Sequence, residues 1–273
     1  MEQLLELLKA ILLGIVQGIT EWLPISSTGH MILLDEFMQM QVTPAFKEMF
    51  FVVVQLGSIL AVLVLYFHKL NPFAPSKTKK QQHETIFLWI KVAIAAVPAG
   101  IVGVLFDDKI DELFYHANIV AIALILYGVF FILIEQWKKQ GSDRITSIQQ
   151  LDYKTALGVG AFQMLALIPG TSRSGSTILG AMILGMNRSV AAEFSFFLAI
   201  PMMFGASFIK LVKFGLVFSG MELAILAIGS ITAFLVSVWA IRFLMGYIKK
   251  HDFTVFGYYR IVLGILVLLY FMF

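Results

Sequence analysis

Two short polar stretches interrupt this otherwise apolar chain, and both contain residue types that can perform chemistry. Residues 21–30 hold a carboxylate, three hydroxyls, a proline, a glycine and an imidazole. Residues 169–177 hold one arginine among serines and threonines. An ionised carboxylate costs about 2–4 kcal/mol at membrane depth on insertion scales, so this density of polar groups in an apolar region indicates a functional site.

The first stretch could supply an acid, a base and a nucleophile. Ser27 and His30 are three residues apart, about one turn of a helix, so a contact between the hydroxyl and the imidazole is feasible. Gln17 precedes Glu21 by four residues, which places both side chains on one face of a helix. These spacings predict proton transfer or nucleophilic attack.

The second stretch is typical of an anion-binding site. Arg173 lies between Ser172 and Ser174, and Gly175 follows at the expected start of a helix. A guanidinium forms forked, charge-assisted hydrogen bonds to phosphate, and a helix N-terminus adds free N–H groups and a positive dipole. The pattern therefore predicts a phosphate clamp.

A structural role is the alternative for most of these residues when each is taken alone. Pro24 and Pro169 could be ordinary helix kinks, and hydroxyls such as that of Ser26 commonly bond their own backbone. His30 could lie at a membrane interface. A structural role explains Arg173 less well, because its side chain could reach water by snorkelling only if a membrane interface were nearby.

The composition places both stretches in a membrane. Of 273 residues, 59% are hydrophobic and 14% are charged, and the mean hydropathy is +0.89. Soluble domains average about 45–50% apolar and about 25% charged residues, so we expect a polytopic membrane protein. The net charge of +3 does not indicate nucleic-acid binding, because the basic residues lie in short loops. Without cysteine, disulfides, thiolate chemistry and cysteine–metal sites are excluded.

The hydropathy pattern predicts an all-α fold of six full transmembrane helices and two re-entrant hairpins. The predicted spans are residues 49–67, 86–106, 118–137, 193–212, 222–245 and 256–273. The apolar pieces flanking Pro24 (7–23 and 31–40) are too short to cross about 30 Å of hydrocarbon comfortably, and the segment 155–190 is likewise broken by the polar residues 169–177. Each pair of half-helices is therefore predicted to enter the membrane and leave it again on the same side. The first segment lacks a basic n-region and is expected to be mature structure rather than a signal peptide.

The Lys and Arg content of the short loops predicts the orientation. Loops 68–85, 138–154 and 246–255 are basic and are predicted to be cytoplasmic, whereas the acidic loop 107–117 is predicted to be external. Both termini are then outside. The first hairpin enters from the outer side and the second from the cytoplasm.

These opposite entry sides predict an inverted repeat within one membrane domain, residues 1–273. Its halves are about 1–137 and 155–273, joined by the cytoplasmic loop 138–154. An offset of 145 residues (169 minus 24) relates Pro24 to Pro169, Ser27 to Ser172 and Glu48 to Glu193. Interrupted helices in matching positions of two halves predict one shared site near the midplane.

Two motifs, in this order and spacing, resemble the bacterial undecaprenyl-diphosphatase family associated with bacitracin resistance. They are Glu-x-Leu-Pro-x-Ser-Ser-Thr-Gly-His at 21–30 and Pro-Gly-x-Ser-Arg-Ser-Gly-x-Thr at 169–177. The similarity covers essentially the whole chain, including Glu-Phe-Ser-Phe-x-Leu-Ala-x-Pro-Met-Met at 193–203. It implies a bacterial plasma-membrane phosphatase that converts undecaprenyl diphosphate to undecaprenyl phosphate and inorganic phosphate, recycling the lipid carrier of cell-wall synthesis.

The resemblance also implies site residues and a cofactor. The predicted catalytic residues are Glu21, Ser27, His30 and Arg173. The predicted substrate-binding residues are Ser26, Thr28, Ser172, Ser174, Gly175 and Thr177. A divalent cation, Mg²⁺ or Ca²⁺, is expected near Glu21 in a site that opens to the outer face. Many members have Glu where this chain has Gln17. Gln17 cannot act as a base, so it at most orients metal or substrate.

The sequence leaves the nucleophile open among Ser27 (deprotonated by His30 or Glu21), His30 and water. The expected partners are a polyprenyl diphosphate lipid and membrane lipids, with no nucleic acid, and the chain could act alone or as a homodimer. The competing function is transport, because inverted repeats with broken helices also build carriers of anions or lipid phosphates. A carrier needs the clamp but no nucleophile beside an acid–base pair, so hydrolysis is favoured.

Overall fold

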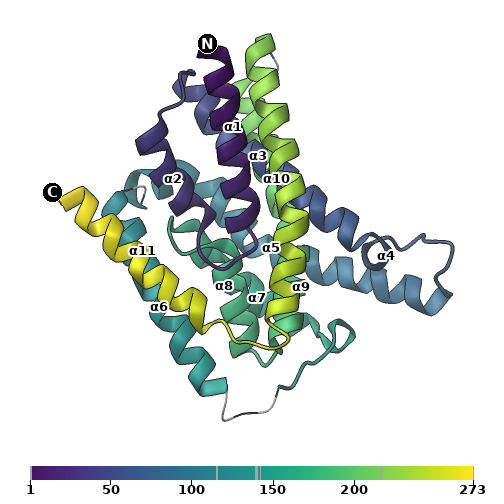
Figure 1. The fold of residues 1–273 in the computed structure, drawn as a ribbon. Coiled ribbons are helices and arrows are strands. Elements are labelled where there is room, and N and C mark those ends of the chain that lie inside the picture. Colours follow the sequence, from purple (N-terminus) through teal and green to yellow (C-terminus); the bar gives the residue numbers. More distant parts are fainter. Residues whose placement is uncertain (1, 115, 139–140, 142, 216, 273) are drawn as a thin grey trace.

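The computed structural model describes residues 2–114, 116–138, 141, 143–215 and 217–272, and these residues form helices joined by short connections (Figure 1). Two short 3₁₀ helices are η1 (Ile148–Gln150) and η2 (Leu165–Leu167). The α-helices are α1 (Glu2–Thr20), α2 (Ser27–Met38), α3 (Pro44–Leu65), α4 (Phe67–Leu70), α5 (Lys79–Phe114), α6 (Ala117–Lys138), α7 (Tyr153–Met164), α8 (Arg173–Ile183), α9 (Arg188–Phe214), α10 (Gly220–Tyr247) and α11 (Thr254–Met272).

Seven of the described helices are long and apolar enough to cross a membrane, which confirms a multi-pass membrane protein. Six of them, α3, α5, α6, α9, α10 and α11, correspond to the six predicted spans. The seventh is α1, which was predicted to be half of a hairpin. Its 19 residues measure about 28 Å at 1.5 Å per residue, so its length alone would let it cross.

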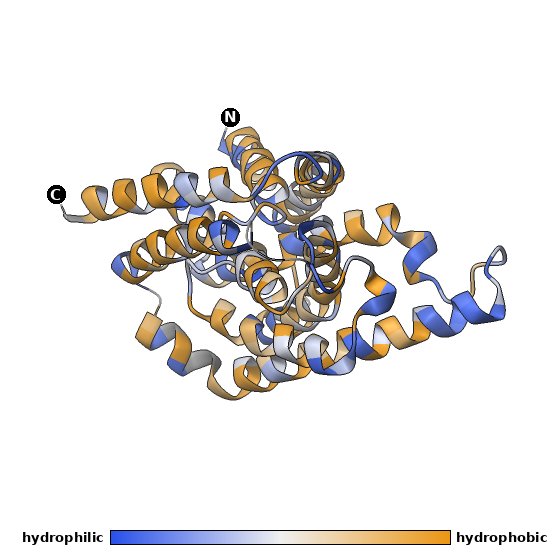
Figure 2. Cartoon of the chain, turned by 90° about the horizontal axis from the view of Figure 1, so that it is seen from below, coloured by the Kyte–Doolittle hydropathy of each residue, from blue (hydrophilic) through white to orange (hydrophobic). Residues whose placement is uncertain are grey.

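The prediction of an acidic loop at 107–117 is wrong over most of its length. Helix α5 continues through this segment to Phe114, and it begins at Lys79, seven residues before the predicted span. Hydropathy marks where a helix leaves an apolar environment, whereas the backbone hydrogen bonds can continue into polar sequence. The early start of α5 helps form an arm that projects from the body beside α4, and Figure 2 shows hydrophilic residues at its end.

Side chains at the helix starts explain where the long helices begin. Thr43 caps α3 by accepting a hydrogen bond from the Phe46 N–H, and Pro44 occupies the first helical position. Asn187 caps α9 in the same way. Ser219 and Glu222 form a capping box at the start of α10.

The helices pack side by side: α10 contacts both α1 and α3, α3 also contacts α9, α5 contacts α7, and α6 contacts α11 (Figure 1). Small residues allow close approach. A Cβ at Gly57 of α3 would lie 2.1 Å from the Ser230 carbonyl oxygen on α10, and one at Gly160 of α7 would lie 2.3 Å from that of Ala95 on α5. Such contacts are typical of helix packing in membranes, where apolar burial alone does not drive association.

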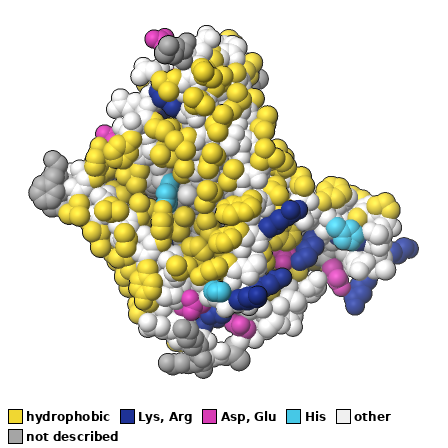
Figure 3. Space-filling model, viewed as in Figure 1, with side chains coloured by type: hydrophobic (Ala, Val, Ile, Leu, Met, Phe, Trp, Pro, Cys, Tyr) yellow, Lys and Arg dark blue, Asp and Glu magenta, His cyan; other side chains and the backbone are white. Residues whose placement is uncertain are grey.

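The outer surface and the interior differ in the expected way for a membrane protein. Hydrophobic side chains cover most of the visible body in Figure 3, and Lys and Arg gather over the α4–α5 arm and near the lower end. Helix α8 lies inside, in contact with α6, α7 and α9, and all of its residues from Ser174 to Met182 are buried. The polar turn before α8 is therefore placed at the centre of the molecule.

Candidate active site

The two polar turns meet, although they are far apart in the sequence. An Arg173 terminal nitrogen (Nη2) lies 2.9 Å from Glu21 Oε1, and this ion pair joins residues separated by 152 positions. Both side chains are largely buried, with 15% and 5% of their surfaces exposed. The structure therefore brings the predicted acid and the predicted anion clamp into one site.

Each turn ends in a serine with an unusual backbone conformation. Ser26 and Ser172 both have φ of 74°, and each accepts a hydrogen bond from the N–H of the glycine three residues later, Gly29 or Gly175. Left-handed backbone costs a serine about 1–3 kcal/mol, so the surrounding contacts must hold it. Both serines thereby start a short helix whose N-terminus faces the site.

This shared geometry corrects one detail of the predicted register. The cap residues are related by 146 positions (172 minus 26), so Ser26 rather than Ser27 corresponds to Ser172. The second turn has one residue more between its proline and its cap. Gly170, with φ of 94°, provides the extra bend, because a Cβ there would lie 2.5 Å from the Val120 carbonyl oxygen.

Glu21 is the centre of the hydrogen-bond network. Its Oε2 accepts from Ser27 Oγ at 2.8 Å and from Gln17 Nε2 at 3.0 Å, while its Oε1 binds Arg173. The shared helix face predicted for Gln17 and Glu21 is confirmed by this contact. The Ser27 proton points at a carboxylate, which is the arrangement of a nucleophile and its base.

His30 binds other partners than the predicted Ser27. Its Nδ1 lies 2.7 Å from the Ser26 carbonyl oxygen, which can only accept, so Nδ1 carries the proton. Its Nε2 then accepts from the Tyr259 hydroxyl at 2.6 Å, and the two rings are stacked. The one-turn spacing permits a Ser27–His30 bond, but the imidazole instead bonds back to the carbonyl of the cap residue.

Arg173 is held on several sides while keeping donors available. One terminal nitrogen (Nη1) lies 2.8 Å from the Ser195 carbonyl oxygen and 3.3 Å from its hydroxyl, and the guanidinium lies 5.8 Å from the Trp22 ring. A guanidinium has five N–H donors, and these contacts with Glu21 and Ser195 occupy at most three of them. At least two remain for an anion.

The predicted substrate-binding residues lie around this pair, and several already have partners. Thr177 is buried and its hydroxyl contacts the Ser195 hydroxyl at 2.7 Å. Ser174 donates to the Leu23 carbonyl oxygen at 3.4 Å and thus links the turns, whereas Thr28 is half-buried on α2. Substrate binding by these hydroxyls stays a prediction, as it does for the capping residues Ser26 and Ser172.

Four residues in or beside the site were missed by sequence reasoning: Ser195 and Tyr259, and also Tyr127, which contacts Ser176, and Arg260, which contacts the second turn. Ser195 lies in the Glu-Phe-Ser-Phe stretch, where one serine among aromatic residues gives only a weak signal. Tyr127 and Tyr259 are indistinguishable from other aromatic residues of apolar spans. Arg260 could have been found, because the argument that singled out Arg173 applies equally to a cation within the span 256–273.

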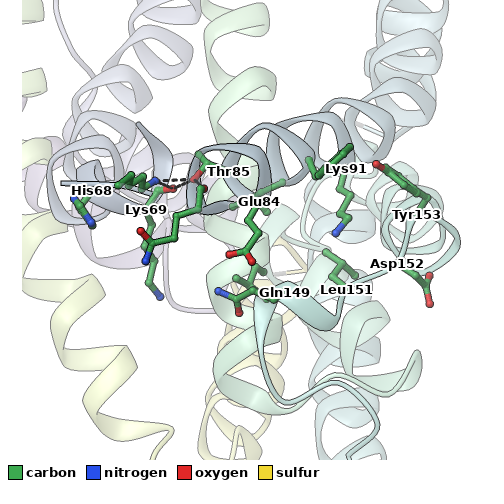
Figure 4. A pocket seen from close by; sticks show the side chains of 14 residues that line it. His68, Lys69, Glu84, Thr85, Lys91, Gln149, Leu151, Asp152 and Tyr153 are labelled. Atoms are coloured by element: carbon green, nitrogen blue, oxygen red, sulfur yellow. Dashed lines mark hydrogen bonds between the residues drawn. The ribbon is translucent and has the colours of Figure 1, made fainter. Parts of the chain in front are cut away.

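A cavity of about 680 Å³ lies elsewhere, between the α4–α5 arm and residues 148–153 (Figure 4). It is lined by Lys69, Lys77 and Lys91, but also by Glu84 and Asp152, so its charges are mixed. None of the predicted catalytic residues lines it. We therefore place the candidate active site at the two turns and not in this cavity.

The metal-binding capacity of the site is limited. No cluster of three or more His, Asp or Glu side chains able to hold a metal occurs among the residues with described positions. Glu21 and Gln17 do provide oxygen atoms of the kind that Mg²⁺ and Ca²⁺ prefer, and Mg²⁺ is commonly held by one or two carboxylates together with substrate phosphates. The residues fit a divalent cation that binds together with a phosphorylated substrate.

The chain is similar to known proteins over nearly its whole length. The family model for bacitracin resistance protein BacA matches residues 10–266. An undecaprenyl-diphosphatase of Acetivibrio thermocellus is 61% identical, covering 98% of this chain and 99% of its own. Undecaprenyl-diphosphatase 1 of Clostridioides difficile is 60% identical, covering 98% and 97%, and an undecaprenyl-diphosphatase of Enterococcus faecalis is 56% identical, covering 97% of each. The chain therefore belongs to the BacA family.

Proposed function

We propose that this membrane protein hydrolyses undecaprenyl diphosphate to undecaprenyl phosphate and inorganic phosphate, which recycles the lipid carrier of cell-wall synthesis. Family membership and 61% identity to an undecaprenyl-diphosphatase over nearly the whole chain support the activity. The observation that carries the mechanism is the Glu21 carboxylate, which binds the Ser27 hydroxyl and the Arg173 guanidinium at the same time.

The proposed reaction begins with attack by Ser27. Glu21 takes the hydroxyl proton, Ser27 Oγ forms a bond to the terminal phosphorus, and the bond from that phosphorus to the bridging oxygen breaks. Undecaprenyl phosphate leaves, and water then hydrolyses the phosphoserine to release inorganic phosphate. Arg173 and the N-terminus of α8 neutralise the phosphate charge, since phosphoryl transfer depends mainly on positioning and electrostatics.

The hydrogen bonds of His30 make it a less suitable nucleophile than Ser27. The lone pair of His30 Nε2 is engaged by the Tyr259 hydroxyl, which disfavours attack by the imidazole. Direct attack by water, with Ser27 only binding substrate, is the remaining alternative and is decided by the experiment below. His30 is instead proposed to orient the start of α2.

A divalent cation, Mg²⁺ or Ca²⁺, is proposed as the cofactor, and Glu21 and Gln17 would hold it. When bound, it supplies charge neutralisation at the phosphate oxygens. Gln17 donates its amide N–H to Glu21, and its carbonyl oxygen would serve as the ligand.

We also propose that the fold is an inverted repeat of residues 1–137 and 155–273. Helix α1 packs on α10 as α7 packs on α5, while α3 pairs with α9 and α6 pairs with α11. Two ion pairs hold the ends of α9: Lys210 of α9 pairs with Glu48 of α3, and Glu193 of α9 pairs with Lys69 of the short helix α4. In this arrangement α1–α2 and α7–α8 are the re-entrant hairpins, the loop 138–154 is cytoplasmic, and the termini and the site face the outer side.

The test is phosphate release from undecaprenyl diphosphate by purified protein in detergent, with Mg²⁺, with Ca²⁺ and with EDTA. Ser27→Ala is compared with Ser76→Ala, which changes an exposed serine in the α4–α5 connection. We expect metal-dependent release that Ser27→Ala abolishes and Ser76→Ala preserves. Release that survives Ser27→Ala would assign the attack to water. No release from folded wild type would refute the phosphatase and favour transport.

A further inference from the structure

Helix α11 carries an arginine that the proposed reaction does not use. Arg260 is wholly buried in an apolar helix, and none of the ion pairs found among the described residues involves it. A buried, unpaired cation is costly, so its hydrogen bonds must be unusually favourable.

Those hydrogen bonds go to the backbone of both polar turns. One terminal nitrogen (Nη1) donates to the Pro24 carbonyl oxygen at 3.1 Å, in the first turn. The other (Nη2) donates to the carbonyl oxygens of Gly170 at 2.7 Å and Thr171 at 3.0 Å, in the second turn. A single side chain thus joins two segments 146 residues apart (170 minus 24).

Helix α6 supports the same guanidinium from another side. Arg260 Nε donates to the Leu124 carbonyl oxygen at 3.4 Å, and its guanidinium lies 5.4 Å from the Tyr127 ring. The Tyr127 hydroxyl in turn accepts from Ser176 of α8 at 3.1 Å. Gly175 leaves room for the guanidinium, because a Cβ there would lie 3.2 Å from its Nη1 nitrogen.

Only arginine can serve all three turn carbonyls at once. The carbonyls belong to irregular backbone beside prolines and left-handed serines, and leaving such a buried group unpaired costs about 1–3 kcal/mol. A guanidinium presents five donors in a rigid planar fork, whereas a lysine ammonium presents three donors from one point. Lysine could bond one turn but could not span both.

We propose that Arg260 is a positioning residue for the phosphatase site, fixing the two turns so that Glu21 and Ser27 meet Arg173. Pro24 lies three residues from both Glu21 and Ser27, and Thr171 lies two residues before Arg173. A displacement of about 1 Å can cost about 10²-fold in rate, so a loosened turn should affect the reaction more than substrate binding. The proposal rests on the phosphatase function above.

The experiment compares Arg260→Lys with Arg242→Lys, which changes an exposed arginine on α10. We measure kcat, KM for undecaprenyl diphosphate and the melting temperature in detergent. Arg260→Lys should lower kcat about 10²-fold and change KM less than about threefold, while the folded protein persists. Arg242→Lys should match wild type.

A rescue measurement separates positioning from general stability. In Arg260→Ala, added guanidinium at non-denaturing concentration should restore part of kcat, with no such effect on Arg242→Ala. Wild-type kcat in Arg260→Lys, a change confined to KM, or loss of the folded species in the lysine variant would each overturn the proposal. Inactive wild type in the same assay would instead refute the phosphatase function.

Discussion

The two turns that meet at the site share a backbone and differ in chemistry. Each ends in a cap serine with φ of 74° that accepts a hydrogen bond from a glycine N–H. The residue directly after the cap is Ser27 in one turn and Arg173 in the other. The same capped turn therefore presents a hydroxyl, the proposed nucleophile, at one helix N-terminus and a cation at the other, and the two meet at Glu21.

The surroundings of the two short helices also differ. On α2, Ser27, Thr28 and His30 are half-buried, whereas α8 is buried throughout from Ser174 to Met182. The start of α2 is thus more accessible than α8, which is anchored in the protein interior. Substitutions in the first turn should mainly affect activity, and those in the second should also affect stability.

The largest effect on activity is expected from changing Arg173, the cation that follows the second turn. Arg173→Lys keeps the charge beside Glu21 but loses the forked guanidinium, which binds Glu21 and Ser195 and is proposed to bind phosphate. We expect phosphate release to fall about 10²–10³-fold, with a melting temperature within a few degrees of wild type. Arg242→Lys is the control, and near-normal activity of Arg173→Lys would contradict the assigned clamp.

A smaller effect is expected for the partner of the first turn. Tyr259→Phe removes the hydroxyl that lies 2.6 Å from His30 Nε2 while keeping the stacked ring. One hydrogen bond contributes about 0.5–1.5 kcal/mol, so kcat should fall about three- to tenfold. Tyr258→Phe, at an exposed position on the same helix, is the matched control. Equal kcat in the two variants would show that Tyr259 does not orient His30.

The caps allow a direct comparison of the turns. Ser26→Ala and Ser172→Ala both remove a capping oxygen, which costs about 1 kcal/mol, at a φ that alanine also tolerates poorly. We expect Ser172→Ala to lower the melting temperature more, because α8 is buried and Ser172 also contacts Ser174. Equal changes in melting temperature would mean that the two turns are equally anchored.

The smallest effect concerns the start of α7. The pKa of the Asp152 carboxyl is lowered because it accepts a hydrogen bond from the Thr155 N–H at 2.6 Å. The ionised Asp152 carboxylate therefore stabilises the folded protein at pH values above the ordinary pKa of Asp. This stabilisation is lost as the pH falls through the lowered pKa of Asp152 in the folded state. Asp152→Ala should destabilise the protein by about 1 kcal/mol at pH 7 without changing kcat. The difference in melting temperature should shrink below about pH 4, and a difference independent of pH would contradict the cap.

Local chemistry determined much of this protein from its sequence. Apolar composition predicted the membrane class and six of the spans, because transfer of side chains into lipid is a property of each segment. Helical periodicity placed Gln17 and Glu21 on one face, as found. The two motifs identified Glu21, Ser27 and Arg173, which the structure brings together.

The tertiary structure decided what depends on contacts between distant segments. The sequence permitted a Ser27–His30 hydrogen bond, but in the fold Ser27 bonds to Glu21, and His30 bonds to Tyr259 of α11. It also sets the register of 146 between the caps and places Arg260 between the turns. Hydrogen-bond partners inside a membrane protein are chosen by which helices lie side by side, and that choice depends on packing across the whole chain rather than on any local pattern.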